Sequence, residues 1–186
     1  MSVISLTSKQ RGTFSIEMAI VGVFFSLLFV FSGDVIIKLT HKGKLDRLSY
    51  SLVNIVKERT QLYSKSYRLT DANVNTAIKI AKASFKRTTN QFDATSFGYV
   101  VESVTFDQAH KPIYDVFRSQ NSPTLGIRCN VAKTLNNMTH LSKITTWGRP
   151  SSLYRVTLCY ETDNWIGDLL GESFTRVQSD ALMIGR

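Results

Sequence analysis

The stretch that decides the fold is Met18-Ala-Ile-Val-Gly-Val-Phe-Phe-Ser-Leu-Leu-Phe-Val-Phe-Ser-Gly33, sixteen residues without a charge. With residues 34–37 it reaches twenty residues, about the length at which an α-helix crosses the hydrocarbon core of a bilayer. Bulky apolar side chains cover every face of such a helix, which is typical of a membrane span or of the core of a large protein. A chain of 186 residues cannot supply that large core. The stretch therefore predicts a membrane span over residues 13–37.

A cleavable secretory signal also begins with a few basic residues and an apolar run. Such a signal needs small residues three and one positions before its cleavage site. The run is followed by Asp34-Val-Ile-Ile-Lys-Leu39, which offers no such site. We therefore expect the span to remain on the mature protein.

Basic residues follow the span directly. The formal net charge of +9 arises between residues 38 and 87, where twelve basic residues stand against three acidic ones, whereas residues 88–186 are neutral. Such a basic segment suits a solvated surface or anionic phospholipid headgroups. Nucleic-acid binding needs the same charge and favours exposed aromatic side chains with it, and we regard it as the weaker interpretation. A mean hydropathy of −0.05 excludes a polytopic membrane protein.

A short motif precedes the span. Lys9 and Arg11 come before Gly12, and Glu17 follows that glycine by five residues. A carboxylate at the start of a membrane helix is costly without a partner, although the helix dipole favours an acidic residue there. A glycine lets a protease approach the backbone closely. Joined to the basic leader and the apolar run, this spacing resembles a type IV prepilin signal.

The resemblance implies that a membrane aspartyl peptidase cuts after Gly12, which makes Thr13 the new N-terminus and Glu17 the fifth residue. Glu17 would then offset the α-amino group of a neighbouring subunit in the low-dielectric interior of a filament. Thr13 stands where type IVa pilins usually carry phenylalanine, and Met18 stands where the major Flp pilins carry tyrosine. The chain is more similar to the minor pseudopilins of tight adherence (Tad) loci, of the TadE and TadF types, with the TadF type favoured.

Two helices are expected, one that ends near residue 67 and one that begins after it. No proline occurs before Pro112, so one helix can run from Phe14 to about Tyr67, with Gly33 and Gly43 as candidate kinks. After the span, a heptad-like stripe is expected to pack on the chain's own globular domain or, as the alternative, on a partner helix. The stripe consists of Leu45, Leu48, Leu52, Ile55, Arg59 and Leu62.

A second helix is expected after Thr70 or Asp71, either of which can cap it. Its apolar face consists of Val74, Ile78, Ala81 and Phe85.

From residue 97 the composition favours strands, expected at residues 97–106, 113–117, 152–160 and 173–179, with a short helix at residues 131–138. Strands that follow long helices predict an α+β globular domain with an antiparallel sheet over residues 88–186. Cys129 and Cys159 are the two cysteines of the chain. In an exported domain they would form a disulfide, whereas a cytoplasmic domain would keep them as thiols.

The sequence carries no recognised catalytic or cofactor motif. Its three histidines have no metal-binding spacing, and it has no phosphate-binding glycine loop, dinucleotide fingerprint or nucleophile elbow. Asp163, Asp168 and Glu172 lie near Trp165 and could form a cation or sugar site, but a solvated loop is the simpler interpretation. We therefore expect a protein that is not an enzyme and uses no metal or other cofactor.

The resemblance implies a membrane-anchored minor pilin that supports assembly of a Tad/Flp-type adhesive pilus. Its partners would be the prepilin peptidase, other pilus subunits and the inner-membrane assembly platform. Residues 1–12 would be a cytoplasmic leader, residues 38–87 basic membrane-proximal helices, and residues 88–186 a periplasmic domain. The basic flank from Lys38 to Arg47 favours the opposite orientation, but long domains are translocated largely regardless of charge.

Two alternatives remain at this point. One is a DNA-uptake or secretion pseudopilin that binds a ligand through Lys79, Lys82, Lys86 and Arg87. The other is a signal-anchored protein unrelated to pili.

Overall fold

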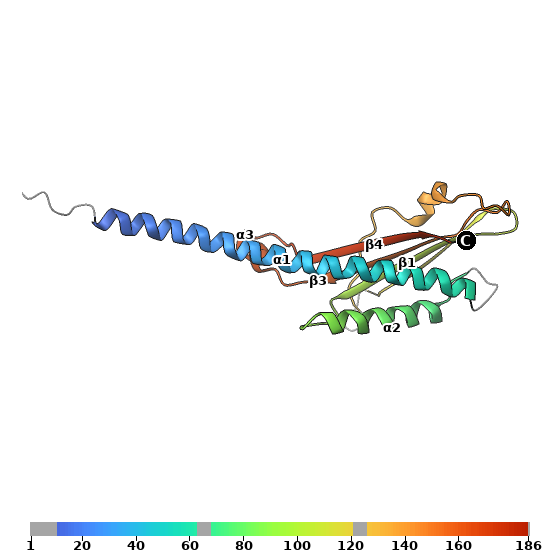
Figure 1. The fold of residues 1–186 in the computed structure, drawn as a ribbon, viewed down its shortest axis with the longest axis horizontal. Helices are drawn as coiled ribbons and strands as arrows, with labels where there is room; N and C mark the ends of the chain where they lie inside the picture. The colour runs from blue at the N-terminus through green and yellow to red at the C-terminus, as the bar shows by residue number, and fades with distance from the viewer. Residues whose placement is uncertain (1–10, 63–67, 121–125, 186) are drawn as a thin grey trace, which may run out of the picture.

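A computed structural model describes residues 11–62, 68–120 and 126–185 (Figure 1). Four strands form one antiparallel sheet in the order β2-β1-β3-β4. The predicted α+β class is therefore confirmed. The elements are α1 (Arg11–Leu62), α2 (Asp71–Thr88), β1 (Phe97–Phe106), β2 (Pro112–Arg118), the 3-10 helix η1 (Leu135–Leu141), β3 (Leu153–Glu161), α3 (Trp165–Leu170) and β4 (Arg176–Ile184).

Helix α1 has two halves with different surroundings. Residues 14–32 are exposed on every side, and the helix projects there from the rest of the protein (Figure 1). From Gly33 onward it joins α2, the sheet and their connections in a folded unit, which we call the head. The helix continues through Gly33 and Gly43 to Leu62, and its predicted end near Tyr67 lies outside the described residues.

The stripe of α1 packs on the head, as expected. Leu45 and Leu52 are buried, and Leu48 and Ile55 are half-buried against the same core. The side chains of Arg59 and Leu62 lie outside the described residues. Since three- and four-residue steps keep these side chains on one face of a helix, a single face of α1 covers β3 and β4.

Helix α2 has the predicted cap and the predicted apolar face. The Thr70 side-chain oxygen accepts a hydrogen bond from the backbone N–H of Asn73 at 3.4 Å. Lys44 of α1 donates a hydrogen bond to the backbone carbonyl of Thr88, which ties the end of α2 to α1. The helix buries Val74, Ala77, Ile78, Ala81 and Phe85.

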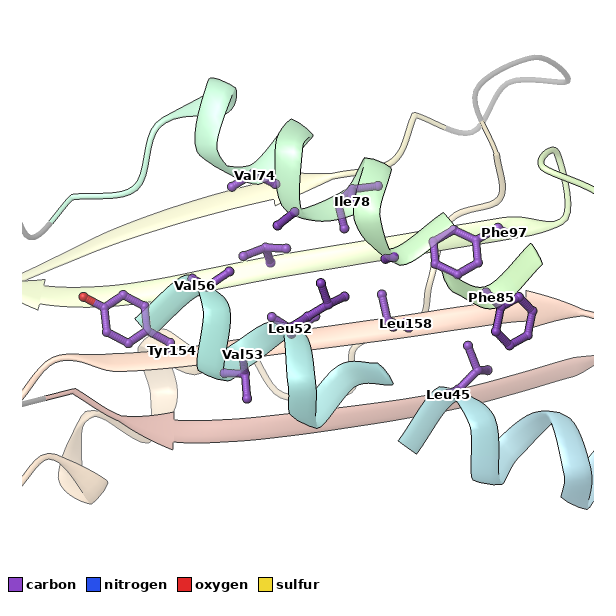
Figure 2. Close-up of a cluster of buried hydrophobic side chains, with 14 of the residues drawn as sticks. Leu45, Leu52, Val53, Val56, Val74, Ile78, Phe85, Phe97, Tyr154 and Leu158 are labelled. Atoms are coloured by element: carbon purple, nitrogen blue, oxygen red, sulfur yellow. The ribbon is translucent and has the colours of Figure 1, made fainter. Parts of the chain in front are cut away.

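The main core lies between the two helices and one face of the sheet (Figure 2). Each fully buried large apolar side chain contributes about 1.5–3 kcal/mol relative to its exposed state. The aromatic rings of Phe85, Phe97 and Tyr160 meet at one end of this core, with the Phe85 centroid 5.9 Å from Phe97 and 5.1 Å from Tyr160. The labelled core residues in Figure 2 come from α1, α2, β1 and β3, and are Leu45, Leu52, Val53, Val56, Val74, Ile78, Phe85, Phe97, Tyr154 and Leu158.

Two sequence-based boundaries were wrong, and one helix was missed. The last strand begins at Arg176, not at residue 173, because residues 173–175 close the preceding loop: the Phe174 N–H donates to Asn164 Oδ1 at 3.1 Å. The short helix expected at residues 131–138 is the 3-10 helix η1, whose buried Leu135 holds it on the sheet. Helix α3 was not predicted.

Candidate functional site

The face of the sheet opposite the helices is covered by residues 127–138, which pack on β1 and β3. In the structure a disulfide joins Cys129 of this covering segment to Cys159 of β3. Gly98 lies opposite Cys159 in the β1–β3 register. A Cβ at Gly98 would collide with the carbonyl oxygen of Ile127 and with Cys159 Sγ, so only glycine lets the covering segment lie this close.

A buried ion pair holds the same segment further along the sheet. Arg155 Nε donates to Glu102 Oε2 at 2.6 Å, and Arg155 Nη2 donates to the Lys133 carbonyl at 2.6 Å. The other carboxylate oxygen accepts from the Tyr114 hydroxyl at 2.6 Å and from the Leu135 N–H at 3.1 Å. Burial, with the Glu102 contact, raises the pKa of Tyr114 to about 12. This cluster joins three strands to the covering segment and has a structural role.

A hollow of about 400 Å³ lies beside the disulfide. Arg118, Arg128 and Arg176 line it, together with small neighbours that include Asn130. The lining offers guanidinium groups but neither a general base nor a free thiol. Across the described parts of the chain, no group of three or more His, Cys, Asp or Glu side chains is placed to hold a metal ion.

The three carboxylates near Trp165 belong to the loop between β3 and β4. Asp163, Asp168 and Glu172 are all exposed to solvent. Asp168 Oδ1 accepts a hydrogen bond from Asn164 Nδ2 at 2.8 Å, within the turn of α3. Asp168 thus has a local structural partner, and the three carboxylates do not converge on a common point.

The four basic residues of α2 are not equivalent. Lys79, Lys86 and Arg87 are exposed, whereas Lys82 is half-buried, with its Nζ 5.8 Å from the centre of the Phe97 ring. At this distance the ammonium group is attracted to the face of the ring. Lys82 therefore has a packing role within the head, and three residues provide free charge to solvent.

The N-terminal half of α1 carries the candidate processing and anchoring site. Gly12 and Thr13 lie in the first turn of the helix, and Glu17 follows with an exposed side chain. The helix contains a segment long and apolar enough to cross a membrane, with a mean hydropathy of 2.4 and 6% of its residues buried in the head. Near the other end of this segment Asp34 forms an ion pair with Lys38, whereas the ion pairs of the described residues leave Glu17 without a basic partner.

A family comparison shows which family the whole chain belongs to. The family model TadF, described as "Putative tight adherence pilin protein F", matches residues 5–186, which is nearly the whole chain. The chain belongs to the TadF family. No curated protein and no solved structure matches it. The resemblance to Tad pilins of the TadF type is therefore confirmed.

Membership in the TadF family has consequences for the other interpretations. It implies a pilin of a Tad pilus, with other pilus subunits as partners and an association with the membrane. The exposed apolar helix fits a single-pass membrane protein of this family. A pilin family also suggests a structural, non-enzymatic protein. The match gives no support to the DNA-uptake alternative.

The stability of this TadF-family head is expected to depend on pH through His41. Its ring stacks on Tyr160 at a centroid distance of 5.5 Å, and its Nδ1 is buried without a hydrogen-bond partner among the described residues. Burial and, secondarily, the charge of Lys44 lower the pKa of His41 below 6.5. The unfolded chain then binds the proton more readily, so stability falls as the pH drops from about 6.5 through the lowered pKa.

The measurement is urea unfolding of the full chain at about pH 7.5 and about pH 5, followed by fluorescence. His41→Phe keeps an aromatic ring against Tyr160 and is expected to lose less stability on acidification than the wild type. His140→Phe changes an exposed histidine and is expected to keep the wild-type loss. An equal loss in wild type and His41→Phe would contradict the assignment.

Proposed function

We propose that this TadF-family chain is a minor pilin that is cut by a prepilin peptidase between Gly12 and Thr13 and then supports assembly of a Tad/Flp-type adhesive pilus. The observation that carries the proposal is a fully exposed and mainly apolar helical segment, residues 14–32, that follows Gly12, contains Glu17 and projects from a folded head. In water this surface is unstable, because each large side chain costs about 1.5–3 kcal/mol when left exposed.

The exposed helix has two environments in this function. It lies in the inner membrane before assembly, and it packs against the helices of other subunits in the filament. In both places Glu17 is surrounded by apolar groups, and the described residues provide it with no basic partner. The α-amino group of Thr13 that cleavage creates on a neighbouring subunit can neutralise it. Processing thus supplies the charge that sets the position of one subunit against the next.

The disulfide supports an orientation with the head in the periplasm. Disulfides persist in oxidising compartments and are rare in the cytosol, so Cys129–Cys159 favours a head that is exported. The basic flank after the span favours the opposite orientation, but two of its cations have partners within the chain. Lys38 pairs with Asp34, and Lys44 donates to Thr88. We therefore place the leader in the cytoplasm and the head in the periplasm.

Processing is tested by intact mass and N-terminal sequencing of the full chain, expressed with and without the prepilin peptidase. The expected result is a terminus at Thr13 only when the peptidase is present. Gly12→Val is expected to abolish this cleavage, because the side chain blocks the close approach of the backbone to the protease.

Gly22→Val is the matched control, since it places the same side chain on the exposed helix, where a Cβ meets no other atom within 4 Å. This variant is expected to be cleaved like the wild type. An intact Met1 in the wild type with and without the peptidase would refute the processing proposal.

A further inference from the structure

We propose that the head touches the bilayer through the loop between β3 and β4, residues 162–175, which makes this loop a second membrane contact beside the span. The proposal rests on the membrane anchoring proposed above and adds a lipid-facing surface to the head. We call residues 162–175 the β3–β4 loop; it contains α3.

The first argument is the position of this loop along α1. Contacts of α1 follow the strands: Ser179 of β4 donates a hydrogen bond to Asp46, and Tyr160 near the end of β3 stacks on His41. The α1 residues on the N-terminal side of His41 therefore lie beside the end of the sheet from which the β3–β4 loop extends. Helix α3 contacts α1, and Figure 1 shows it beside the helix at the end of the head that faces the exposed segment.

The second argument is the depth of that position in a bilayer. The hydrocarbon core is about 30 Å thick, which corresponds to about 20 helical residues. A span that begins at Phe14 therefore ends near Gly33. Gly33 is half-buried directly after the exposed residues 14–32, and Asp34 is 7% exposed. The head thus begins at the depth where the hydrocarbon core ends, and the β3–β4 loop lies at the level of the lipid headgroups.

The third argument is the chemistry that the loop presents there. Trp165 is 58% exposed and Phe174 is 55% exposed, although both are large apolar side chains. Ile36 and Leu39 of α1 are also exposed at this level. Tryptophan is enriched at membrane interfaces, because its ring is apolar and its indole N–H can still donate to headgroups or water. The exposed Lys42 can reach lipid phosphates from the same region.

The loop is held in one conformation by Asn164. Its side-chain Nδ2 donates to Asp168 Oδ1 at 2.8 Å and to the Glu172 carbonyl at 2.9 Å, and its Oδ1 accepts from the Phe174 N–H at 3.1 Å. The backbone N–H of Thr162 donates to the Thr175 carbonyl at 2.8 Å and closes the base of the loop. Trp165 and Phe174 are therefore positioned before any membrane contact, which lowers the entropy cost of that contact.

The carboxylates of the β3–β4 loop make electrostatic attraction to anionic lipids an unfavourable basis for this contact. Asp163, Asp168 and Glu172 are exposed and would be repelled by anionic lipids. We therefore expect the contact to depend on the aromatic side chains and to differ little between vesicles of phosphatidylcholine and vesicles that also contain phosphatidylglycerol.

The experiment uses the two tryptophans of the chain, Trp147 and Trp165. They precede and follow the nine-residue strand β3, which separates them by about 30 Å. Trp147 is 88% exposed and lies at the opposite end of that strand from the loop. The variants Trp147→Phe and Trp165→Phe therefore each leave one reporter, and they serve as matched controls for each other.

The full chain is reconstituted into phosphatidylcholine vesicles with a bromine-labelled lipid, with the label either near the headgroup or deep in the acyl chain. In Trp147→Phe, the emission of Trp165 is expected to shift to shorter wavelength on reconstitution and to be quenched most by the shallow label. In Trp165→Phe, the emission of Trp147 is expected to be unaffected by either label and to remain quenchable by aqueous iodide.

A third variant separates failure of this inference from failure of the anchoring proposal. It combines Phe25→Trp with Trp147→Phe and Trp165→Phe, and it places the reporter in the middle of the span. Quenching by the deep label is expected. If the deep label has no effect, the span is not inserted and the anchoring proposal fails.

If the span reporter is quenched but Trp165 responds to neither label, the head stands away from the bilayer and the inference is overturned. Protection of Trp165 from iodide that grows with the protein-to-lipid ratio, without quenching by lipid, would show a protein contact in its place and would also overturn the inference.

Discussion

Replacing Arg155 with methionine is expected to lower the free energy of unfolding by about 3–5 kcal/mol, because the buried carboxylate of Glu102 is left without its counter-charge. Both side chains are almost fully buried, with 7% of Arg155 and none of Glu102 exposed. The variant also removes the hydrogen bond to the Lys133 carbonyl, which holds the covering segment on the sheet. Urea unfolding of the full chain in detergent, followed by circular dichroism, measures the change.

Two further variants show whether the buried charge is the cause. Adding Glu102→Gln to Arg155→Met removes the charge but keeps an acceptor for Tyr114 and Leu135, and it is expected to recover part of the lost stability. Arg68→Met breaks the pair with Asp115, in which Arg68 is 60% exposed, and is expected to change stability little. Equal destabilisation by Arg155→Met and Arg68→Met would contradict this explanation.

Loss of the disulfide is expected to destabilise the head by about 3–4 kcal/mol, because Cys129 and Cys159 close a loop of about 30 residues in the unfolded chain. The variant with both cysteines replaced by alanine is compared with the wild type by the same urea unfolding. A reductant is expected to lower the stability of the wild type to that of the variant and to leave the variant unchanged. A wild type that unfolds identically with and without reductant would contradict this prediction.

Features that depend on a single helix could be predicted from the local sequence pattern. The long apolar helix follows from sixteen uncharged residues, and the absence of proline before Pro112 allowed a continuous α1, with Gly33 and Gly43 left as candidate kinks. A cap at Thr70 or Asp71 and the apolar face of α2 were predicted because a cap acts within one turn and a helical face repeats every three or four residues; the structure has Thr70 as the cap. The spacing of Gly12 and Glu17 likewise pointed to the pilin family that the chain belongs to.

The strands and loops were predicted less well, and the reasons are physical. The start of β4 depends on Asn164, which binds Phe174 from ten residues away and keeps it in the loop. Residues 135–141 form a 3-10 helix on the sheet because Leu135 enters the core and its N–H donates to Glu102, 33 residues earlier. A prediction from neighbouring residues in the sequence includes neither the Asn164 contact of Phe174 nor the Glu102 contact of Leu135.

The sequence by itself determined the long apolar helix, the candidate processing motif and the class of the fold, because these depend on hydrophobicity and spacing along the chain. Only the tertiary structure decided which buried charges are paired, that His41 stacks on Tyr160, and that α3 contacts α1. Each of these features joins residues that are distant in the chain. Such contacts form only when the sheet packs on α1 and α2, so the sequence shows the residues but not their partners.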